Sequence, residues 1–152
     1  MKRSADFILV LLLGSILLLG SCSSDALDET PSAVSTFITR YFPNIRLESY
    51  TPTADGGHKA KLDNSATIVF NKDNQWVEID GEGVTLPDVL LYDQLPPALY
   101  SYLKGTEQQN GVYSMTRDNF YYKLTMLDTV ITYTIATGAV SYPGQLTGEE
   151  IR

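Results

Sequence analysis

The sequence is poor in the residues that build most cofactor and metal sites. It contains one cysteine, Cys22, and one histidine, His58, among 152 residues. A single cysteine cannot form an internal disulfide, so the core alone must stabilise the fold. One histidine and one cysteine are also too few soft ligands for an ordinary zinc site. We therefore expect neither a cofactor nor a bound metal.

Positive charge is scarce as well. Eleven Lys and Arg residues face 18 Asp and Glu residues, which gives a net charge of −7 at pH 7. Proteins that bind nucleic acid do so through basic patches that neutralise phosphates. The charge balance therefore argues against a nucleic acid partner and against electrostatic binding to anionic lipids.

The chain has one long hydrophobic run, and it lies near the N-terminus. The run covers 7–19 and is shorter than the roughly 20 apolar residues of a spanning helix. Basic residues Lys2 and Arg3 precede it, which is the pattern of an export signal. The run ends in Leu-Gly-Ser-Cys22, which resembles a lipobox. We therefore predict a lipoprotein signal peptide over 1–21, cleavage before Cys22, and attachment to a membrane through lipid on Cys22.

The segment after this cysteine is small and acidic, without a periodic apolar pattern. We interpret 22–30 as a flexible tether to the outer membrane. Its acidic residues, Asp25, Asp28 and Glu29, imperfectly resemble signals for surface display. Both the periplasmic leaflet and the cell surface stay open as locations.

A helix and a set of strands are expected next. Pro31 suits the first helical position, and apolar residues follow at the spacing of one helical face. These are Val34, Phe37, Ile38, Tyr41 and Phe42. Short β-type runs separated by turn residues then cover 45–50, 58–62, 66–70 and 75–79. The connections are too short for crossover helices, so the pairing should be antiparallel.

The second half has the same order. After a short apolar piece at 89–92, Pro96-Pro97 opens another helical pattern, and Leu99, Tyr102 and Leu103 form its face. Strands are expected at 112–117, 120–126, 130–135 and 139–142. We therefore predict an α+β domain over 31–142, made of two tandem repeats (31–80 and 96–142). Each repeat would pack a helix on one face of an antiparallel sheet of about four strands. The polar tail would cover 143–152.

Several segments together resemble a known family. They are the lipobox, "PSAVSTFITRYFP", the hairpin "VFNKDNQWVEI", "LPPALYSYL" and a second set of Tyr-rich strands. They are similar to the β-lactamase-inhibitor-like, PepSY-like family of small exported proteins. The chain departs from the usual repeat at Asn74, where the first hairpin normally carries glycine; Asn also accepts a left-handed backbone. The resemblance implies an architecture and a habit of protein binding, and it carries over no inhibitory residue.

The sequence contains no recognisable pattern of catalytic residues. His58 has no neighbouring acid in the sequence to orient it, and no Gly-x-Ser-x-Gly elbow is present. The acids in 80–83 and 71–74 do not match a dedicated calcium loop and are explained by turn formation. We therefore expect a protein that is not an enzyme and has no catalytic residues.

The alternation of side chains between the two faces of each strand indicates where a partner would bind. In 120–126 and 130–135, alternation places Tyr121, Lys123, Thr132 and Thr134 on the face away from the helices. An antiparallel sheet covered on one side leaves the other open to water. On the opposite face, Phe120 and Ile135 should meet the helices. Trp76 is expected in the core if the hairpin at 71–74 carries a bulge, and on the open face otherwise.

These observations favour a non-catalytic, membrane-anchored module that binds an envelope protein or peptide. Two alternatives stay open: an accessory subunit of an outer-membrane assembly, and an uncharacterised hydrolase.

Overall fold

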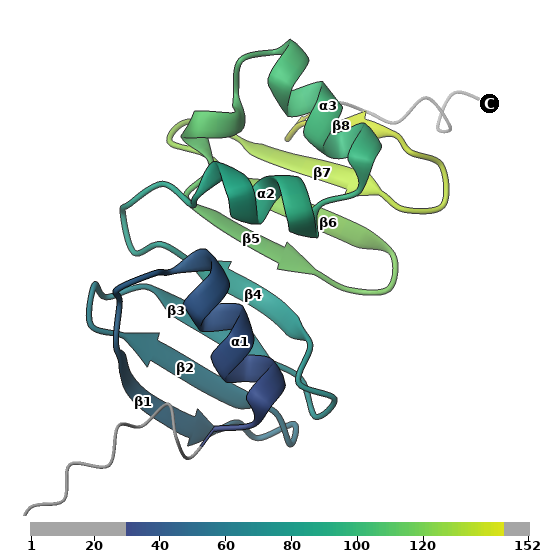
Figure 1. The fold of residues 1–152 in the computed structure, drawn as a ribbon. Helices are drawn as coiled ribbons and strands as arrows, with labels where there is room; N and C mark the ends of the chain where they lie inside the picture. The colour runs from purple at the N-terminus through teal and green to yellow at the C-terminus, as the bar shows by residue number, and fades with distance from the viewer. Residues whose placement is uncertain (1–29, 145–152) are drawn as a thin grey trace, which may run out of the picture.

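The computed structural model describes residues 30–144, which form a broad sheet with helices on one side (Figure 1). The helices are α1 (Ser32–Tyr41), α2 (Asp88–Gln94) and α3 (Pro97–Gly105), with a short 3-10 turn, η2 (Gln109–Gly111). The first four strands are β1 (Leu47–Pro52), β2 (His58–Leu62), β3 (Thr67–Phe70) and β4 (Trp76–Asp80). The others are β5 (Ser114–Arg117), β6 (Tyr121–Thr125), β7 (Val130–Thr134) and β8 (Val140–Ser141). No helix within this described range is long and apolar enough to cross a membrane.

All eight strands belong to one antiparallel sheet in the order β1 to β8. The prediction of two tandem repeats, each with its own sheet of about four strands, is therefore wrong. Strand β4 pairs with β5 through Ile79 opposite Met115, and this ladder makes the sheet continuous. Three helices rather than two pack on it, because 89–92, expected as a short apolar piece, lies within α2.

The core lies between the sheet and the helices. Helix α1 buries Val34, Ile38 and Tyr41, which recur at i, i+4 and i+7 on one helical face. Phe37, expected on the same face, is only partly buried. Helices α2 and α3 contribute buried leucines, and the strands contribute Ala60, Leu62, Ile68, Phe70, Ile79, Met115, Leu124, Ile131 and Tyr133.

Trp76 occupies the core because β4 carries a bulge. Val69 pairs with Glu78 and Phe70 pairs with Trp76, so Val77 is an extra residue on β4. Trp76 and Ile79 are three residues apart, and regular alternation would place them on opposite faces. With the bulge, both are buried, and Trp76 is 2% exposed.

Two residues expected in the core are at the surface. Phe120 is 68% exposed and Ile135 is 43% exposed. Both lie one residue beyond the ends of β6 and β7. Both side chains lie on the same face as the buried residues of these strands, but none of the described helices covers them.

Candidate binding face

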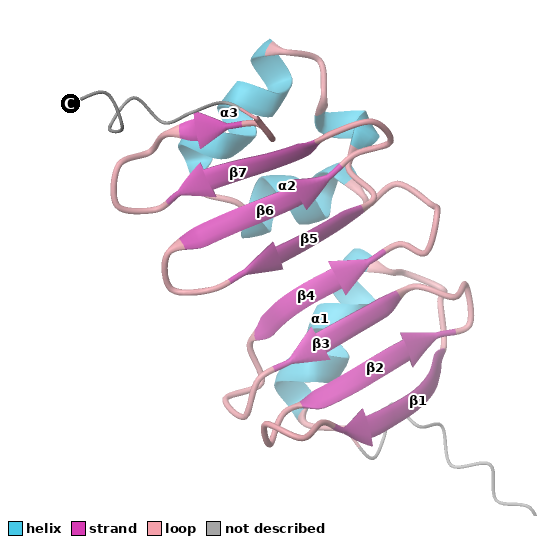
Figure 2. Cartoon of the chain, turned by 180° about the vertical axis from the view of Figure 1, so that it is seen from behind, coloured by secondary structure: helices cyan, strands magenta, loops and turns pink. Residues whose placement is uncertain are grey.

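Among residues 30–144, nothing packs on the side of the sheet opposite the helices. Figure 2 shows this side, with the strands in front and every helix behind them. Direct cross-strand partners form one row that reaches from β1 to β8, which we call the central row. It consists of Thr51, Lys59, Val69, Glu78, Thr116, Lys123, Thr132 and Ser141. At a strand spacing near 4.8 Å, eight strands give a face roughly 34 Å wide.

The structure brings the four predicted face residues together. Tyr121 lies directly opposite Thr134, and Lys123 lies directly opposite Thr132. Tyr121 and Lys123 are exposed, while the two threonines are half-buried between their neighbours. These four side chains therefore form one patch on β6 and β7. Whether they bind a partner stays a prediction. The fifth predicted site residue, Cys22, lies outside the described residues.

On β5 to β7 this face is rich in hydroxyl groups, and Lys123 is its charged residue there. On β5 to β7, the side chains between the buried positions are Ser114, Thr116, Tyr121, Lys123, Thr125, Thr132 and Thr134, together with Val130. Hydroxyl groups donate and accept hydrogen bonds at modest desolvation cost compared with charges. Such a surface suits the polar atoms of another protein or an extended peptide.

The turn beside Tyr121 is held by Asp118. Its Oδ1 accepts hydrogen bonds from the backbone N–H groups of Phe120 and Tyr121, each at 2.7 Å. These bonds to the charged carboxylate lower the pKa of Asp118 below its usual value. The carboxylate therefore fixes the entry into β6 and the direction of Tyr121.

Arg117 contacts Trp76 at the point where the pairing between β4 and β5 ends. The Arg117 guanidinium lies 4.2 Å from the centroid of the Trp76 ring, and its Nε donates a 2.7 Å hydrogen bond to the Trp76 carbonyl. This side chain satisfies an acceptor that the β4–β5 ladder does not reach. A cleft of about 200 Å³ beside it is lined by Asn71, Gln75, Asp118, Asn119 and Tyr122. Sequence analysis missed Arg117, because nothing in the local pattern showed that β5 would lie beside β4.

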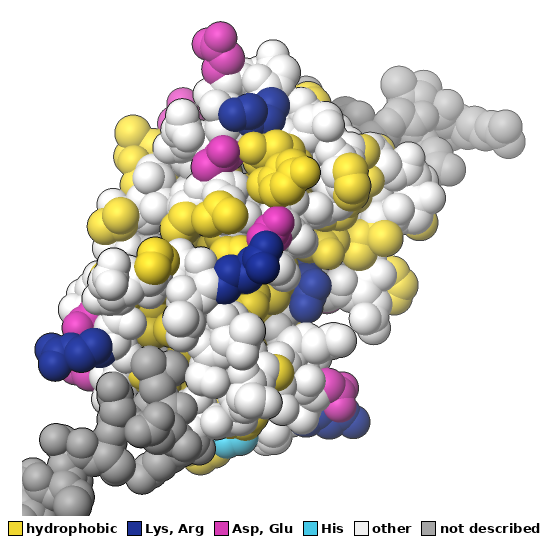
Figure 3. All heavy atoms as spheres, in the orientation of Figure 1, with side chains coloured by type: hydrophobic (Ala, Val, Ile, Leu, Met, Phe, Trp, Pro, Cys, Tyr) yellow, Lys and Arg dark blue, Asp and Glu magenta, His cyan; other side chains and the backbone are white. Residues whose placement is uncertain are grey.

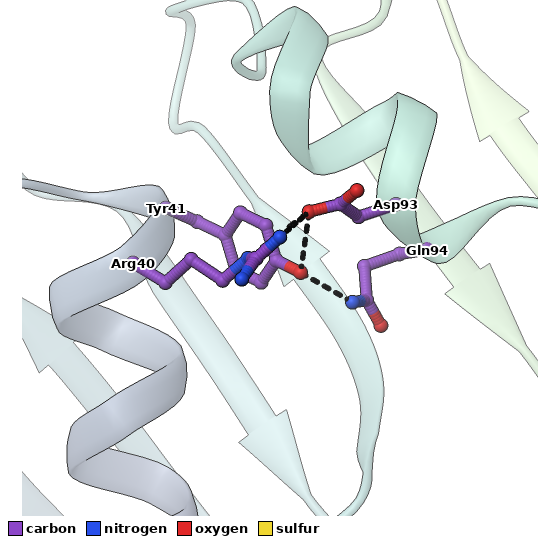
Figure 4. A network of polar contacts seen from close by, with 4 residues as sticks. All are labelled: Arg40, Tyr41, Asp93 and Gln94. Atoms are coloured by element: carbon purple, nitrogen blue, oxygen red, sulfur yellow. Dashed lines mark hydrogen bonds and ion pairs between the residues drawn. The ribbon is translucent and has the colours of Figure 1, made fainter.

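A network of polar contacts joins α1 and α2 (Figure 4), and Trp76 extends it to β4. Arg40 forms an ion pair with Asp93 at 2.6 Å, and the Tyr41 hydroxyl donates to the same carboxylate oxygen. Gln94 donates through Nε2 to the Tyr41 hydroxyl and accepts a hydrogen bond from Trp76, both at 2.7 Å. The hydrogen bond from Arg40 is the main reason that the pKa of Asp93 is lowered. Each member has a partner, which indicates that the network fixes the helices on the sheet.

The residues considered for catalysis or metal binding have other contacts. The His58 ring is stacked on Tyr50, with centroids 4.5 Å apart and planes 4° from parallel. In the two acidic loops, Asn71 accepts bonds from the backbone of Asp73 and Gln75, and Asp80 accepts one from Glu82. These are turn-forming bonds. Within residues 30–144, no group of three His, Cys, Asp or Glu side chains could hold a metal ion.

Comparison with known proteins shows the fold. No family model and no curated protein match the sequence. A proposed periplasmic protein of the DUF2874 family from Bacteroides vulgatus has a TM-score of 0.62 and 18% identity, over 76% of this chain and 90% of that chain. A proposed calcium-regulated periplasmic protein from Bacteroides thetaiotaomicron has a TM-score of 0.61 and 16% identity, over 76% and 92%. Another proposed periplasmic protein of unknown function from Bacteroides vulgatus has a TM-score of 0.62 and 19% identity, over 76% and 94%. Most of this chain and nearly all of each neighbour therefore share one fold.

Proposed function

We propose that this chain is a non-catalytic lipoprotein of the bacterial envelope, which binds a protein or peptide partner through the uncovered face of its sheet. The observation that carries the proposal is the central row, which crosses all eight strands on a side that no described helix covers. A specific interface buries about 800 Å² on each partner, and a face that crosses eight strands can supply a large part of this area.

The location in the envelope has two supports. One is the export signal and lipobox in the sequence, and the other is the periplasmic description of three proteins that share the fold. Lipid attachment at Cys22 rests on the sequence alone. Its test is metabolic labelling with a palmitate analogue. Label should enter the natural chain and be lost in Cys22→Ser, and label that persists in the variant would refute the anchor.

The patch formed by Tyr121, Lys123, Thr132 and Thr134 is the proposed centre of the interface. Tyrosine gives contact area at low entropic cost, and lysine adds a charge that can orient the partner. Since Tyr121 and Lys123 are exposed strand residues, their removal should weaken binding without unfolding the domain.

The experiment uses a photo-crosslinking amino acid at Thr132 in the native organism. A discrete adduct is expected, and Tyr121→Ala combined with Lys123→Ala should abolish it while leaving Tm nearly unchanged. The matched control is Tyr92→Ala with Lys104→Ala, which removes the same two residue types from exposed positions on the helix side. The control should retain the adduct. No adduct at Thr132, or an equal loss in both double variants, would show that the face is not the interface.

A further inference from the structure

Three exposed apolar side chains gather at one end of β6 and β7. Phe120 is 68% exposed, Ile135 is 43% exposed, and Tyr121 is 41% exposed. The rings of Phe120 and Tyr121 have centroids 6.3 Å apart, and the Ile135 N–H donates a 2.8 Å bond to the Phe120 carbonyl. We call these three residues the aromatic tip. Contiguous exposed apolar groups of this kind mark sites of contact with proteins or membranes.

The backbone groups of Phe120 and Tyr121 and the N–H of Ile135 already have hydrogen-bond partners. The N–H groups of Phe120 and Tyr121 bond to Asp118, and the two carbonyls accept bonds from the N–H groups of Ile135 and Asp118. Burying an unpaired polar group in an apolar environment is costly. Phe120 and Tyr121 can therefore leave water without exposing unpaired backbone groups, which favours their insertion into a lipid interface.

The chain enters the fold at the same end of the sheet as the tip. Phe42 and Pro43, which follow α1, line a cleft together with Asn64 and Gly81, so the C-terminal end of α1 lies beside the turns that follow β2 and β4. In an antiparallel sheet, the turns that follow β1, β3, β5 and β7 lie at the opposite end. Helix α1 has ten residues, about 15 Å, and its N-terminal end therefore points toward that opposite end. Figure 1 shows the start of α1 and these four turns on the same side of the molecule.

The length of chain before Thr30 limits how far this end can lie from an anchor. From Cys22 to Thr30 there are eight residue steps, which span at most about 29 Å when fully extended. An anchor at Cys22 therefore keeps Thr30, and with it the end of the sheet where α1 begins, within that distance of the lipid surface. A short tether also raises the effective concentration of a weak contact to the millimolar range.

We propose that the aromatic tip, Phe120, Tyr121 and Ile135, rests in the headgroup region of the bilayer to which Cys22 is attached. Phe, Tyr and Ile side chains are favourable at this depth, because their apolar parts leave water while the tyrosine hydroxyl stays hydrated. In this orientation the strands stand on the membrane by their ends. Tyr121 belongs to both the tip and the patch, whereas Lys123 and Thr132, two residues further along β6 and β7, stay accessible to a partner. This proposal rests on the lipid anchor at Cys22 that belongs to the proposed function, and it does not depend on a protein or peptide partner.

A second exposed apolar surface on the molecule provides the comparison. Figure 3 shows hydrophobic side chains over α2 and α3, and Val89 and Tyr92 are among the exposed ones. Leu127, which is 87% exposed, lies in the turn between β6 and β7, at the opposite end of β6 from Phe120. Leu127 and Tyr92 therefore offer matched positions that are exposed and apolar but are not part of the tip.

In the experiment a synthetic lipid is attached to Cys22, so the result does not depend on whether the cell acylates this residue. The chain from Cys22 onward is coupled through its only thiol to a maleimide lipid in phosphatidylcholine vesicles that contain brominated acyl chains. Single variants Phe120→Trp, Leu127→Trp and Tyr92→Trp report contact with lipid, since bromine quenches nearby tryptophan. The unmodified chain gives the background from the buried Trp76.

Emission from Phe120→Trp should shift to shorter wavelength and be quenched, while emission from Leu127→Trp and Tyr92→Trp should not change. Ile135→Trp is a second reporter and should behave as Phe120→Trp does. Equal quenching at all four positions, or none at Phe120 and Ile135, would overturn the proposed orientation. Because the vesicles contain no partner protein, the quenching result does not depend on the interface proposed at Thr132. In the crosslinking test, Lys123→Ala alone leaves the tip unchanged and should still weaken the adduct.

Discussion

The indole Nε1 of Trp76 donates a 2.7 Å hydrogen bond to Oε1 of Gln94, which joins a buried strand residue to the last residue of α2. Gln94 uses its other amide atom to donate to Tyr41 on α1. One glutamine side chain therefore connects β4, α1 and α2. This contact makes Gln94 the first position at which we predict an effect.

Gln94→Met should destabilise the fold by about 1–3 kcal/mol, because it leaves the buried indole N–H without a partner. Methionine has a similar length, so loss of packing is small. The free energy of unfolding is measured by urea denaturation. Gln75→Met is the control, since the Gln75 side chain is exposed and should change stability by less than about 0.5 kcal/mol. Equal effects of the two substitutions would mean that the hydrogen bond is unimportant.

The pair formed by Arg40 and Asp93 should make stability depend on pH. The hydrogen bond from Arg40 is the main cause that lowers the pKa of Asp93 in the folded state, with a further contribution from Tyr41. A carboxyl whose pKa is lowered on folding adds stability above its unfolded pKa, about 3.9, and loses it as pH falls through the folded pKa. The stability difference between the natural chain and Asp93→Asn should therefore be largest above about pH 5 and shrink toward pH 3.

This pH dependence is measured by denaturant unfolding over the same range. Asp63→Asn is the control, because the ion pair between Asp63 and Arg46 is more exposed, with 36% and 80% of these side chains accessible. It should lower stability by less at neutral pH. A difference between the natural chain and Asp93→Asn that does not change from pH 7 to pH 3 would contradict the role of this carboxylate.

Local sequence patterns predicted the elements better than their arrangement. The expected strand at 58–62 matches β2, and 130–135 matches β7 to within one residue. The pairing of β4 with β5 was not predicted, because Ile79 and Met115 are separated by two helices and their contact leaves no periodic signal. The apolar run at 89–92 fitted both helix and strand, since four consecutive apolar residues have no period.

The candidate site shows the same limit. Alternation was enough to place Tyr121 and Lys123 on one face, because the side-chain period within a strand is local. Burial was predicted less well, since it depends on what covers each face. Phe120 has the parity of a core residue but lies beyond the helices, and Arg117 acquires its role only through contact with Trp76 on another strand.

The packing of α1 provides another prediction. Ile38 is fully buried, whereas Phe37 is partly buried and packs edge-on against Phe70 and Tyr41. Ile38→Ala should cost about 2–5 kcal/mol, and Phe37→Ala should cost roughly half of the 3–5 kcal/mol that is typical of a fully buried phenylalanine. Thr39→Ala, at an exposed position of the same helix, is the control and should have little effect in urea denaturation. A larger loss for Phe37→Ala than for Ile38→Ala would show that α1 is rotated relative to this structure.

Two glycines should respond in opposite ways to the same substitution. A Cβ atom added at Gly57 would lie 2.1 Å from the Phe70 carbonyl oxygen, which is far inside contact distance and belongs to the backbone of the neighbouring strand. Gly57→Ala must therefore push β2 and β3 apart near His58, and we expect a loss of about 1–3 kcal/mol or more. At Gly105, the last residue of α3, an added Cβ would meet nothing within 4 Å. Gly105→Ala should be neutral or stabilise by up to about 1 kcal/mol, because alanine favours the helix. Thermal unfolding of both variants checks the pair, and a Gly57→Ala protein as stable as the natural chain would contradict the close approach of these strands.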